Sequence, residues 1–164
     1  MVGERDHRPE PAVAIELALA MLPAAALEQS LSRCTEAGAA GFVLVRAERS
    51  QARAEKTERW RSICREAAML AGRLRVPEVR GPVAFEAAWR TAVEPWLLDR
   101  EALPPLRSLK ASGEVTLFVG PEGGWTPGER RLAGDRRLSL GPRNLRAETA
   151  ALVGLATGLA ALDA

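Results

Sequence analysis

The sequence has few residues of the kinds that build metal centres, disulfide frameworks and histidine-based catalytic sites. Its one histidine, His7, lies in a polar N-terminal segment, which excludes a histidine triad and a metal site built on imidazole. The two cysteines, Cys34 and Cys64, have neither the spacing of a metal site nor the number that a disulfide framework needs. We therefore expect no metal cofactor and a cytosolic type of cysteine usage.

Secretion and membrane signals are missing as well. Residues 3–10 are charged where a signal peptide would have its apolar core. The longest apolar run, residues 150–162, is shorter than the roughly 20 residues that a bilayer requires. These absences predict a cytoplasmic protein that does not bind membranes.

The sequence also lacks an excess of either sign of charge. Lys+Arg 23 against Asp+Glu 21 gives a net charge of only +2. That balance excludes a histone-like or acidic polyelectrolyte and leaves the class of partner open. The basic residues are nearly all arginine, whose planar guanidinium suits phosphate and carboxylate groups and so permits a nucleic-acid partner. A GC-rich genome, which would also account for the many alanines, explains the bias equally well.

What is present is a regular alternation of apolar runs and helical-period segments in 164 residues, enough for one domain with its own core. The pattern predicts strands over residues 13–22, 41–46, 76–79, 93–98, 114–119 and 137–140. It predicts helices over about 24–37, 56–74, 85–92, 126–133 and 146–162. Continuous apolar strands separated by helices indicate an α/β domain with a largely parallel sheet and helices on both faces. We expect a flexible leader over residues 1–11 and a single domain over residues 12–164.

Two strand-to-helix segments carry the candidate chemistry. The first, residues 120–125 (GPEGGW), follows the clearest strand and precedes Thr126-Pro127-Gly128-Glu129, which predicts a capped helix start. Ligands bind at the carboxyl ends of parallel strands, and glycines let the backbone approach them closely. The segment matches neither the dinucleotide-binding nor the phosphate-loop pattern. Taken alone, it is equally compatible with a structural tight turn.

The second segment, residues 140–150 (LGPRNLRAETA), also follows a short strand and opens a helix. It places Arg143, Arg146 and Glu148 within six residues. Taken alone, Glu148 fits an ordinary first helical turn, where the helix dipole favours a carboxylate. Two such loops in one short chain nevertheless favour a ligand site.

The phrases FVGPEGGWTPGE and LSLGPRNLRAETAAL closely resemble the paired signature of the ribosomal small-subunit methyltransferase E family. The resemblance continues through LEQSLSRCTEAGAAGFVLVRAERS and ERWRSICREAAMLAGRLRVPEV, so that it covers about residues 12–162. This family methylates N3 of a uridine in 16S rRNA and belongs to the SPOUT superfamily. Membership implies a trefoil knot at the C-terminal end, S-adenosylmethionine (SAM) as cofactor, 16S rRNA or the 30S subunit as substrate, and a homodimer through the C-terminal helix.

The resemblance also implies roles for individual residues. The expected cofactor contacts come from three loops: Leu98, Gly120, Pro121, Glu122, Gly123, Gly124, Leu138, Ser139, Leu140, Gly141, Asn144 and Leu145. Arg143 and Arg146 would hold an rRNA phosphate or the uracil oxygens, and Glu148 would either orient them or help to remove the N3 proton. The expected RNA-binding residues are Arg33, Arg49, Arg53 and Arg73.

Some parts of the family pattern are absent. The N-terminal PUA-type domain of the family is not in the sequence, a lysine-containing stretch is replaced by residues 23–26, and Glu-Gln-Ser is replaced by residues 69–71. Because lost phosphate contacts weaken RNA binding strongly, two alternatives remain. One is a catalytically degenerate knotted dimer that acts as a binding module, and the other is a methyltransferase that acts on a different RNA. The last helix is apolar all round, and Gly154 and Gly158 would allow another backbone to approach closely. A helix of this kind is buried, either in the core or between subunits.

Overall fold

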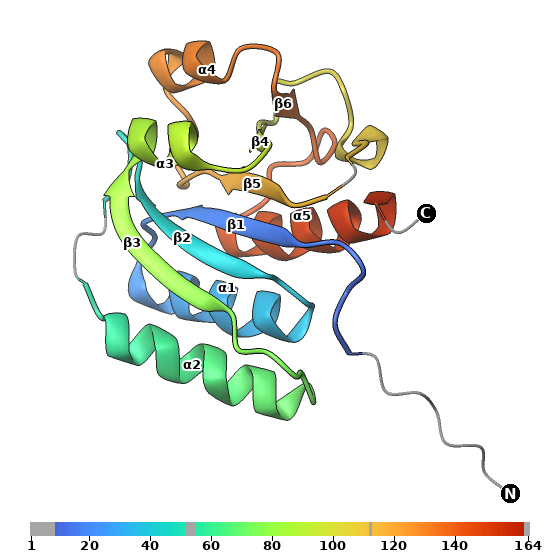
Figure 1. Ribbon diagram of the computed structural model, residues 1–164. Coiled ribbons are helices and arrows are strands. Elements are labelled where there is room, and N and C mark those ends of the chain that lie inside the picture. Colours follow the sequence, from blue (N-terminus) through green and yellow to red (C-terminus); the bar gives the residue numbers. More distant parts are fainter. Residues whose placement is uncertain (1–8, 52–54, 112, 163–164) are drawn as a thin grey trace, which may run out of the picture.

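A six-stranded parallel sheet forms the centre of the computed structural model, which describes residues 9–51, 55–111 and 113–162 (Figure 1). The strand order is β3-β2-β1-β5-β4-β6, and every pair of neighbouring strands is parallel. The strands are β1 Ile15–Ala20, β2 Gly41–Arg46, β3 Glu78–Ala84, β4 Pro95–Leu98, β5 Val115–Val119 and β6 Arg137–Leu138.

Helices cover both faces of this sheet (Figure 1). They are α1 Ala24–Glu36, α2 Thr57–Leu70, α3 Phe85–Thr91, α4 Pro127–Ala133 and α5 Ala147–Leu162, with a short 3-10 helix, η1, at Leu106–Ser108. Helices α1, α2 and α5 pack on one face, and α3 and α4 lie on the other. This arrangement confirms the predicted α/β class, the parallel sheet and the helices on both faces.

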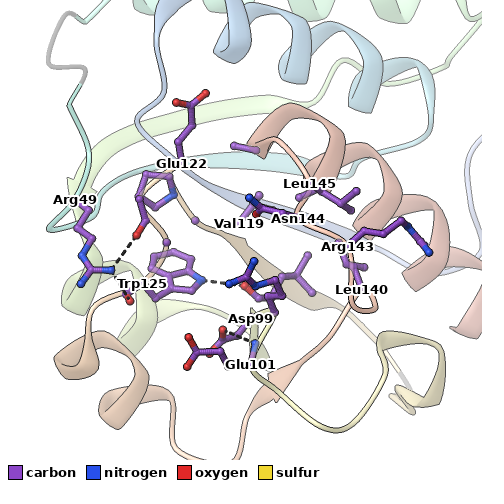
Figure 2. Close-up of a pocket in the computed structure, with 18 of the residues that line it drawn as sticks. Arg49, Asp99, Glu101, Val119, Glu122, Trp125, Leu140, Arg143, Asn144 and Leu145 are labelled. Carbon is purple, nitrogen blue, oxygen red and sulfur yellow. Dashed lines mark hydrogen bonds between the residues drawn. The ribbon is translucent and has the colours of Figure 1, made fainter.

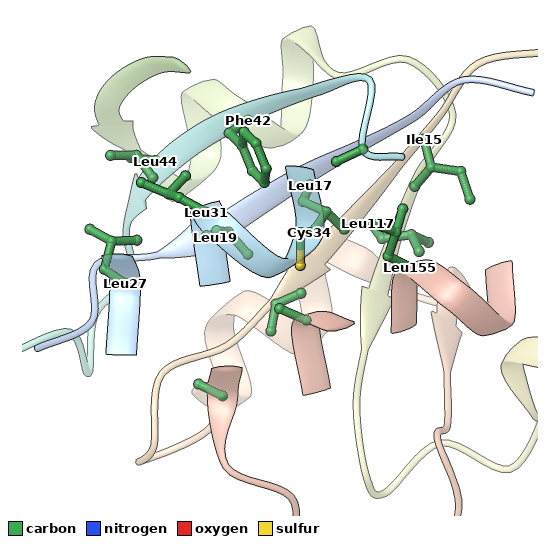
Figure 3. Packing of buried hydrophobic residues seen from close by; sticks show 14 of the residues in the cluster. Ile15, Leu17, Leu19, Leu27, Leu31, Cys34, Phe42, Leu44, Leu117 and Leu155 are labelled. Carbon is green, nitrogen blue, oxygen red and sulfur yellow. The ribbon is translucent and has the colours of Figure 1, made fainter. Parts of the chain in front are cut away.

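The central strand β1 shows why the sheet is buried on both sides. All six of its residues are buried, and alternate side chains enter different cores because strand side chains point to opposite faces. Leu17 and Leu19 lie in the larger core with helices α1 and α5 (Figure 3). Ala18 and Ala20 face the smaller core, where their short side chains leave room for the aromatic rings of Phe85, Trp89, Phe118 and Trp125.

The two cysteines are structural members of the larger core. Cys34 and Cys64 are free thiols on α1 and α2, and both are fully buried. Burial raises the pKa of the Cys34 thiol to about 12, so the thiol stays protonated at neutral pH. Each therefore packs as a small apolar side chain and has no nucleophilic role.

The predicted ends of one helix and one strand differ most from the structure. Helix α2 ends at Leu70 because Gly72 takes a left-handed conformation (φ +65°), so Leu74, predicted on its apolar stripe, is 73% exposed. Strand β3, predicted only for residues 76–79, continues to Ala84. Gly81 (φ +89°) and a register shift between Val43 and Val45 of β2 allow the strand to pass the proline that follows.

Arg73 ties the beginning of the domain to its core. Its side chain is 4% exposed and donates hydrogen bonds to the carbonyls of Thr35 and Ala39 and to the Glu10 carboxylate at 2.6 Å. The backbone amides of residues 74–75 donate to the same carboxylate. Of the predicted flexible leader, residues 1–8 lie outside the described residues, whereas Glu10 is bonded to the folded domain.

This contact predicts a specific response to acid. The hydrogen bond from Arg73 holds the pKa of the Glu10 carboxyl below its ordinary value of 4.5, against the raising effect of burial. A carboxyl whose pKa is lowered by folding contributes stability above its unfolded pKa and loses it as the pH falls through the folded value. Glu10→Gln should therefore lower the melting temperature at pH 7, and the gap to the parent protein should close below pH 4.5. The control is Glu58→Gln, whose carboxylate is 90% exposed beside Arg61, and it should show a much smaller gap.

Candidate active site

A pocket of about 330 Å³ opens at the carboxyl ends of β4 and β5 (Figure 2). Its walls come from three places in the chain: the residues after β4, the glycine-rich loop 120–125, and the loop 140–145 with the start of α5. All the predicted cofactor contacts line it except Leu138 and Ser139. The structure thus brings the two signature loops, 20 residues apart in sequence, to one cavity.

The glycine-rich loop is closely packed against a buried indole. Trp125 is 2% exposed, and its Nε1 donates a hydrogen bond of 2.9 Å to the carbonyl of Leu98. A Cβ added to Gly120 would lie 3.0 Å from the Trp125 ring, so a side chain at residue 120 would displace the indole. Arg49 donates to the carbonyl of Gly123 at 2.9 Å (Figure 2). Arg49, predicted to bind RNA, is thus an exposed residue at the pocket that also holds this loop.

The helix that follows the loop begins at the predicted capping box. The Thr126 side chain accepts from the Glu129 amide, and the Glu129 carboxylate accepts from the Thr126 amide at 2.8 Å. Glu129 is 7% exposed, and its other oxygen accepts from the Glu48 amide at 2.9 Å. The loop is therefore fixed at its end to the residues that follow β2.

Leu138 and Ser139 lie behind the pocket instead of lining it. Leu138 is buried in β6 opposite Leu98, and Ser139 is 9% exposed. The Ser139 hydroxyl accepts a hydrogen bond from the Gly141 amide at 3.0 Å. The Ser139 backbone amide donates to the Pro104 carbonyl, and the Ser139 carbonyl accepts from the Leu106 amide. Both residues therefore support the turn that carries Leu140 and Gly141 into the wall.

Apolar and charged side chains both line the pocket. The apolar ones come from Leu98, Val119, Leu140, Leu145, Ala147 and Ala150, and the charged ones come from Arg49, Asp99, Arg100, Glu101, Glu122, Arg130 and Arg143. The sequence prediction missed Asp99, Glu101 and Arg130. Asp99 directly follows β4, a position at which the rule for parallel sheets indicates a ligand, and its partner Arg130 lies 31 residues further along the chain.

The three predicted catalytic residues lie close to the start of α5 in the sequence: Arg143 and Arg146 precede the helix, and Glu148 is in its first turn. Arg143 lines the pocket and is exposed, and Figure 2 shows it extending from its loop away from Trp125. Arg146 is exposed and Glu148 is half-buried, but neither belongs to the lining. One Glu148 oxygen, Oε2, is buried without a hydrogen-bond partner among the described residues. Such a group is an acceptor that a bound molecule could satisfy.

Of the predicted RNA-binding residues, only Arg49 lines the pocket among those that the structure describes. Arg33 is exposed on α1 and does not line the pocket. Arg53 lies outside the described residues. Because the guanidinium of Arg73 is buried and bonded within the chain, we leave Arg73 out of the RNA surface.

No group of three or more His, Cys, Asp or Glu side chains among the described residues is placed to hold a metal ion. Within the same residues, no helix has the length and apolar character needed to span a membrane.

Comparison with known families identifies the domain. Residues 8–158 match the family model described as an RNA methyltransferase domain. The chain belongs to this family. An RNA methyltransferase domain accounts for a ligand pocket at the strand ends, and it agrees with the resemblance seen in the two signature loops.

Individual relatives agree with the family. The chain is 36% identical to ribosomal RNA small subunit methyltransferase E of Synechocystis sp., over 94% of this chain and 55% of that protein, and 36% identical to the Mycobacterium bovis enzyme over 78% and 56%. The structure of the Neisseria gonorrhoeae enzyme bound to SAM superimposes with a TM-score of 0.81 at 29% identity, over 93% of this chain and 68% of that one. The Legionella pneumophila protein Lpg2936, solved with SAM, gives 0.83 at 30% identity over the same shares. The chain thus spans little more than half the length of the curated relatives.

Proposed function

We propose that this RNA methyltransferase domain uses SAM to methylate N3 of a uridine in 16S rRNA, in the cytoplasm. The observation that carries the proposal is the pocket formed jointly by loops 120–125 and 140–145. Its volume of about 330 Å³ falls within the range of small-molecule sites. Its apolar side chains suit an adenine ring, and the Glu101 and Glu122 carboxylates in its lining suit the amino and hydroxyl groups of the same molecule.

In this proposal the chain acts mainly by alignment. Bound SAM would supply a methyl group that is already activated on a sulfonium, and on transfer the carbon–sulfur bond would break and leave a neutral thioether. The backbone of residues 120–124 and 140–145 fixes the direction in which that methyl faces the base, and correct orientation alone can account for several kcal/mol of a barrier. The fixed ends of both loops suit this task, because Trp125 and the Glu129 capping box hold the first and Ser139 holds the second.

The base must lose the proton on N3 as N3 forms its bond to the methyl carbon. Glu148 Oε2 is a buried acceptor without a partner among the described residues, so we assign it the proton. Negative charge that develops on the uracil oxygens would be offset by Arg143 and Arg146, which form no ion pair with another described residue. The same guanidiniums could instead hold the phosphate beside the target nucleotide.

Two measurements test this function. Isothermal titration with SAM should show binding, and its absence at high micromolar concentration would contradict the enzyme proposal. Labelled methyl from SAM should then appear in purified 30S subunits and, after digestion to nucleosides, as N3-methyluridine. Label in bulk tRNA alone would favour a different RNA substrate. Binding without label in either RNA would favour a binding module.

One structural observation favours the binding module as the second candidate. At residues 69–71 the family has a polar Glu-Gln-Ser, whereas here Met69 is 74% exposed and Leu70 is 81% exposed. Apolar side chains at this exposed position cannot replace polar contacts to RNA. The domain on its own would then hold its cofactor better than its RNA.

A homodimer through α5 is the assembly that we propose. The structure corrects the expected role of two glycines, since Cβ atoms at Gly154 and Gly158 would meet Leu98 and Ile15 at 2.6 and 2.9 Å. These glycines therefore allow α5 to approach its own sheet. The opposite side of α5 is exposed and uncharged, with Thr149, Val153, Ala156 and Ala160 at helical spacing.

The proposed dimer interface on the exposed side of α5 can be tested by placing a charge there. We expect Val153→Asp to turn a dimer into a monomer in sedimentation velocity, because burying an unpaired carboxylate is costly. Leu132→Asp is a matched control, since Leu132 on α4 is 39% exposed and Val153 is 38% exposed. A dimer that survives Val153→Asp, or a monomeric parent protein, would contradict this interface.

The C-terminal trefoil knot is also part of the proposal. Residues 136–138 bond β4 on one side, and Ser139 bonds Pro104 and Leu106 on the other. The chain therefore passes between two earlier segments just before it enters α5. This path is what a knotted C-terminal end requires.

A further inference from the structure

Asp99 is the most heavily bonded carboxylate at the pocket. It is 4% exposed and directly follows β4. Its Oδ2 accepts from Arg130 Nε at 2.9 Å and from Arg137 Nη1 at 3.4 Å. Its Oδ1 accepts from Arg130 Nη2 at 3.2 Å and from the Glu101 amide at 3.0 Å. With four donors already bound, this carboxylate is occupied within the protein.

The partners of Asp99 come from each of the segments that build the pocket. Arg130 lies on α4, which begins where the glycine-rich loop ends, and Arg137 lies on β6, which leads into loop 140–145. Two further hydrogen bonds run in parallel with these ion pairs: the Asp99 amide donates to the Leu138 carbonyl, and the Trp125 indole Nε1 donates to the Leu98 carbonyl. One buried carboxylate therefore joins the end of β4 to the supports of both loops.

We infer that Asp99 is a positioning residue for the cofactor: it sets the two ligand loops at their working separation without touching the ligand. The bidentate pair with Arg130 has a fixed planar geometry, so it transmits the position of β4 to α4. Loss of the negative charge would leave two guanidiniums close together with a weaker acceptor between them. This inference rests on the proposed use of SAM.

The variant Asp99→Asn keeps the shape of the side chain and removes its charge. We expect the Kd and the KM for SAM to rise about tenfold or more, because a site that is no longer preorganised must be ordered on binding. At saturating SAM, kcat should change by less than about threefold, since Asp99 does not touch the reacting atoms. A loss of stability alone would leave KM at its parental value in a folded sample.

The control variant also replaces a carboxylate with an amide, but at a residue away from the pocket. Glu16 is 9% exposed and pairs with Arg80 on the far part of the sheet, and it does not line the pocket. Glu16→Gln should therefore lower the melting temperature without changing the Kd for SAM by more than twofold. If Asp99→Asn does not fold, Arg130→Lys tests the same pair, because it keeps the charge and loses the bidentate geometry.

Hydrogen exchange separates this inference from the proposed function. In protein without ligand, Asp99→Asn should speed amide exchange in residues 120–125 and 139–145, and Glu16→Gln should not. A parent protein that fails to bind SAM would contradict the proposed function, and faster exchange in these loops would still support the positioning role. If Asp99→Asn leaves amide exchange in both loops unchanged and keeps the parental Kd for SAM, the positioning role of Asp99 is overturned.

Discussion

Replacing Arg146 with alanine is expected to lower the rate of methyl transfer to 30S subunits by about 10²–10³-fold, the usual cost of removing one group that stabilises developing charge. The fold should be unaffected, because Arg146 is exposed and forms no ion pair with another described residue. It also directly precedes α5, where a positive charge opposes the helix dipole. A cation in this unfavourable place has no structural purpose that the contacts reveal, which favours a role toward the substrate.

Single-turnover transfer of labelled methyl is the measurement, with the Kd for SAM determined in parallel. The Kd should be unchanged, since Arg146 does not line the pocket. Arg131→Ala is the control, because Arg131 is an exposed cation on α4 that forms no ion pair among the described residues. Arg146→Lys should restore part of the rate if charge alone matters, and less if a planar guanidinium is needed. Parental activity in Arg146→Ala would remove this residue from the site.

Most of the fold could be predicted because its signals are local. Strand β2 has the predicted bounds Gly41–Arg46, and α4 begins at the predicted Thr126 capping box. The predicted order of strands and helices is also the observed one. Apolar runs, prolines, glycines and caps act within a few residues of chain, so the sequence displays them directly.

The errors have a local and a long-range cause. Leu74 continues the apolar spacing of α2, but the left-handed Gly72 ends the helix before it. Gly154 and Gly158 are small residues on an apolar helix, and periodicity does not tell whether they face their own sheet or another subunit. For these two glycines the deciding contact comes from a segment far away in the sequence.

The candidate site also combines features that local sequence signals predict with a contact between distant segments that they do not. Both signature loops could be predicted, since each follows a strand and precedes a helix. The carboxylate that joins them could not, because Asp99 is bonded to Arg130 and Arg137, which are 31 and 38 residues away. An arginine-rich surface and an arginine that binds a buried carboxylate look alike in sequence.

Arg73→Ala is expected to have the largest effect on stability. The buried guanidinium is bonded to Glu10 and to the carbonyls of Thr35 and Ala39. Its removal would take the cation away from the Glu10 carboxylate and one donor away from each of the two carbonyls, and breaking a buried pair of this kind costs about 3–5 kcal/mol. That loss is a large fraction of the free energy of unfolding of an ordinary domain, so denaturant unfolding should detect it readily.

The outcome also decides between two interpretations of Arg73. A structural role predicts that Arg73→Ala shifts the urea midpoint strongly, whereas Arg59→Ala, which removes an exposed partner of Glu28, shifts it little. An RNA-binding role predicts the opposite: an unchanged midpoint and weaker RNA binding. Because every hydrogen bond found for the Arg73 side chain is made within the domain, we expect the first result. Arg73 would then act on RNA only by keeping the domain folded.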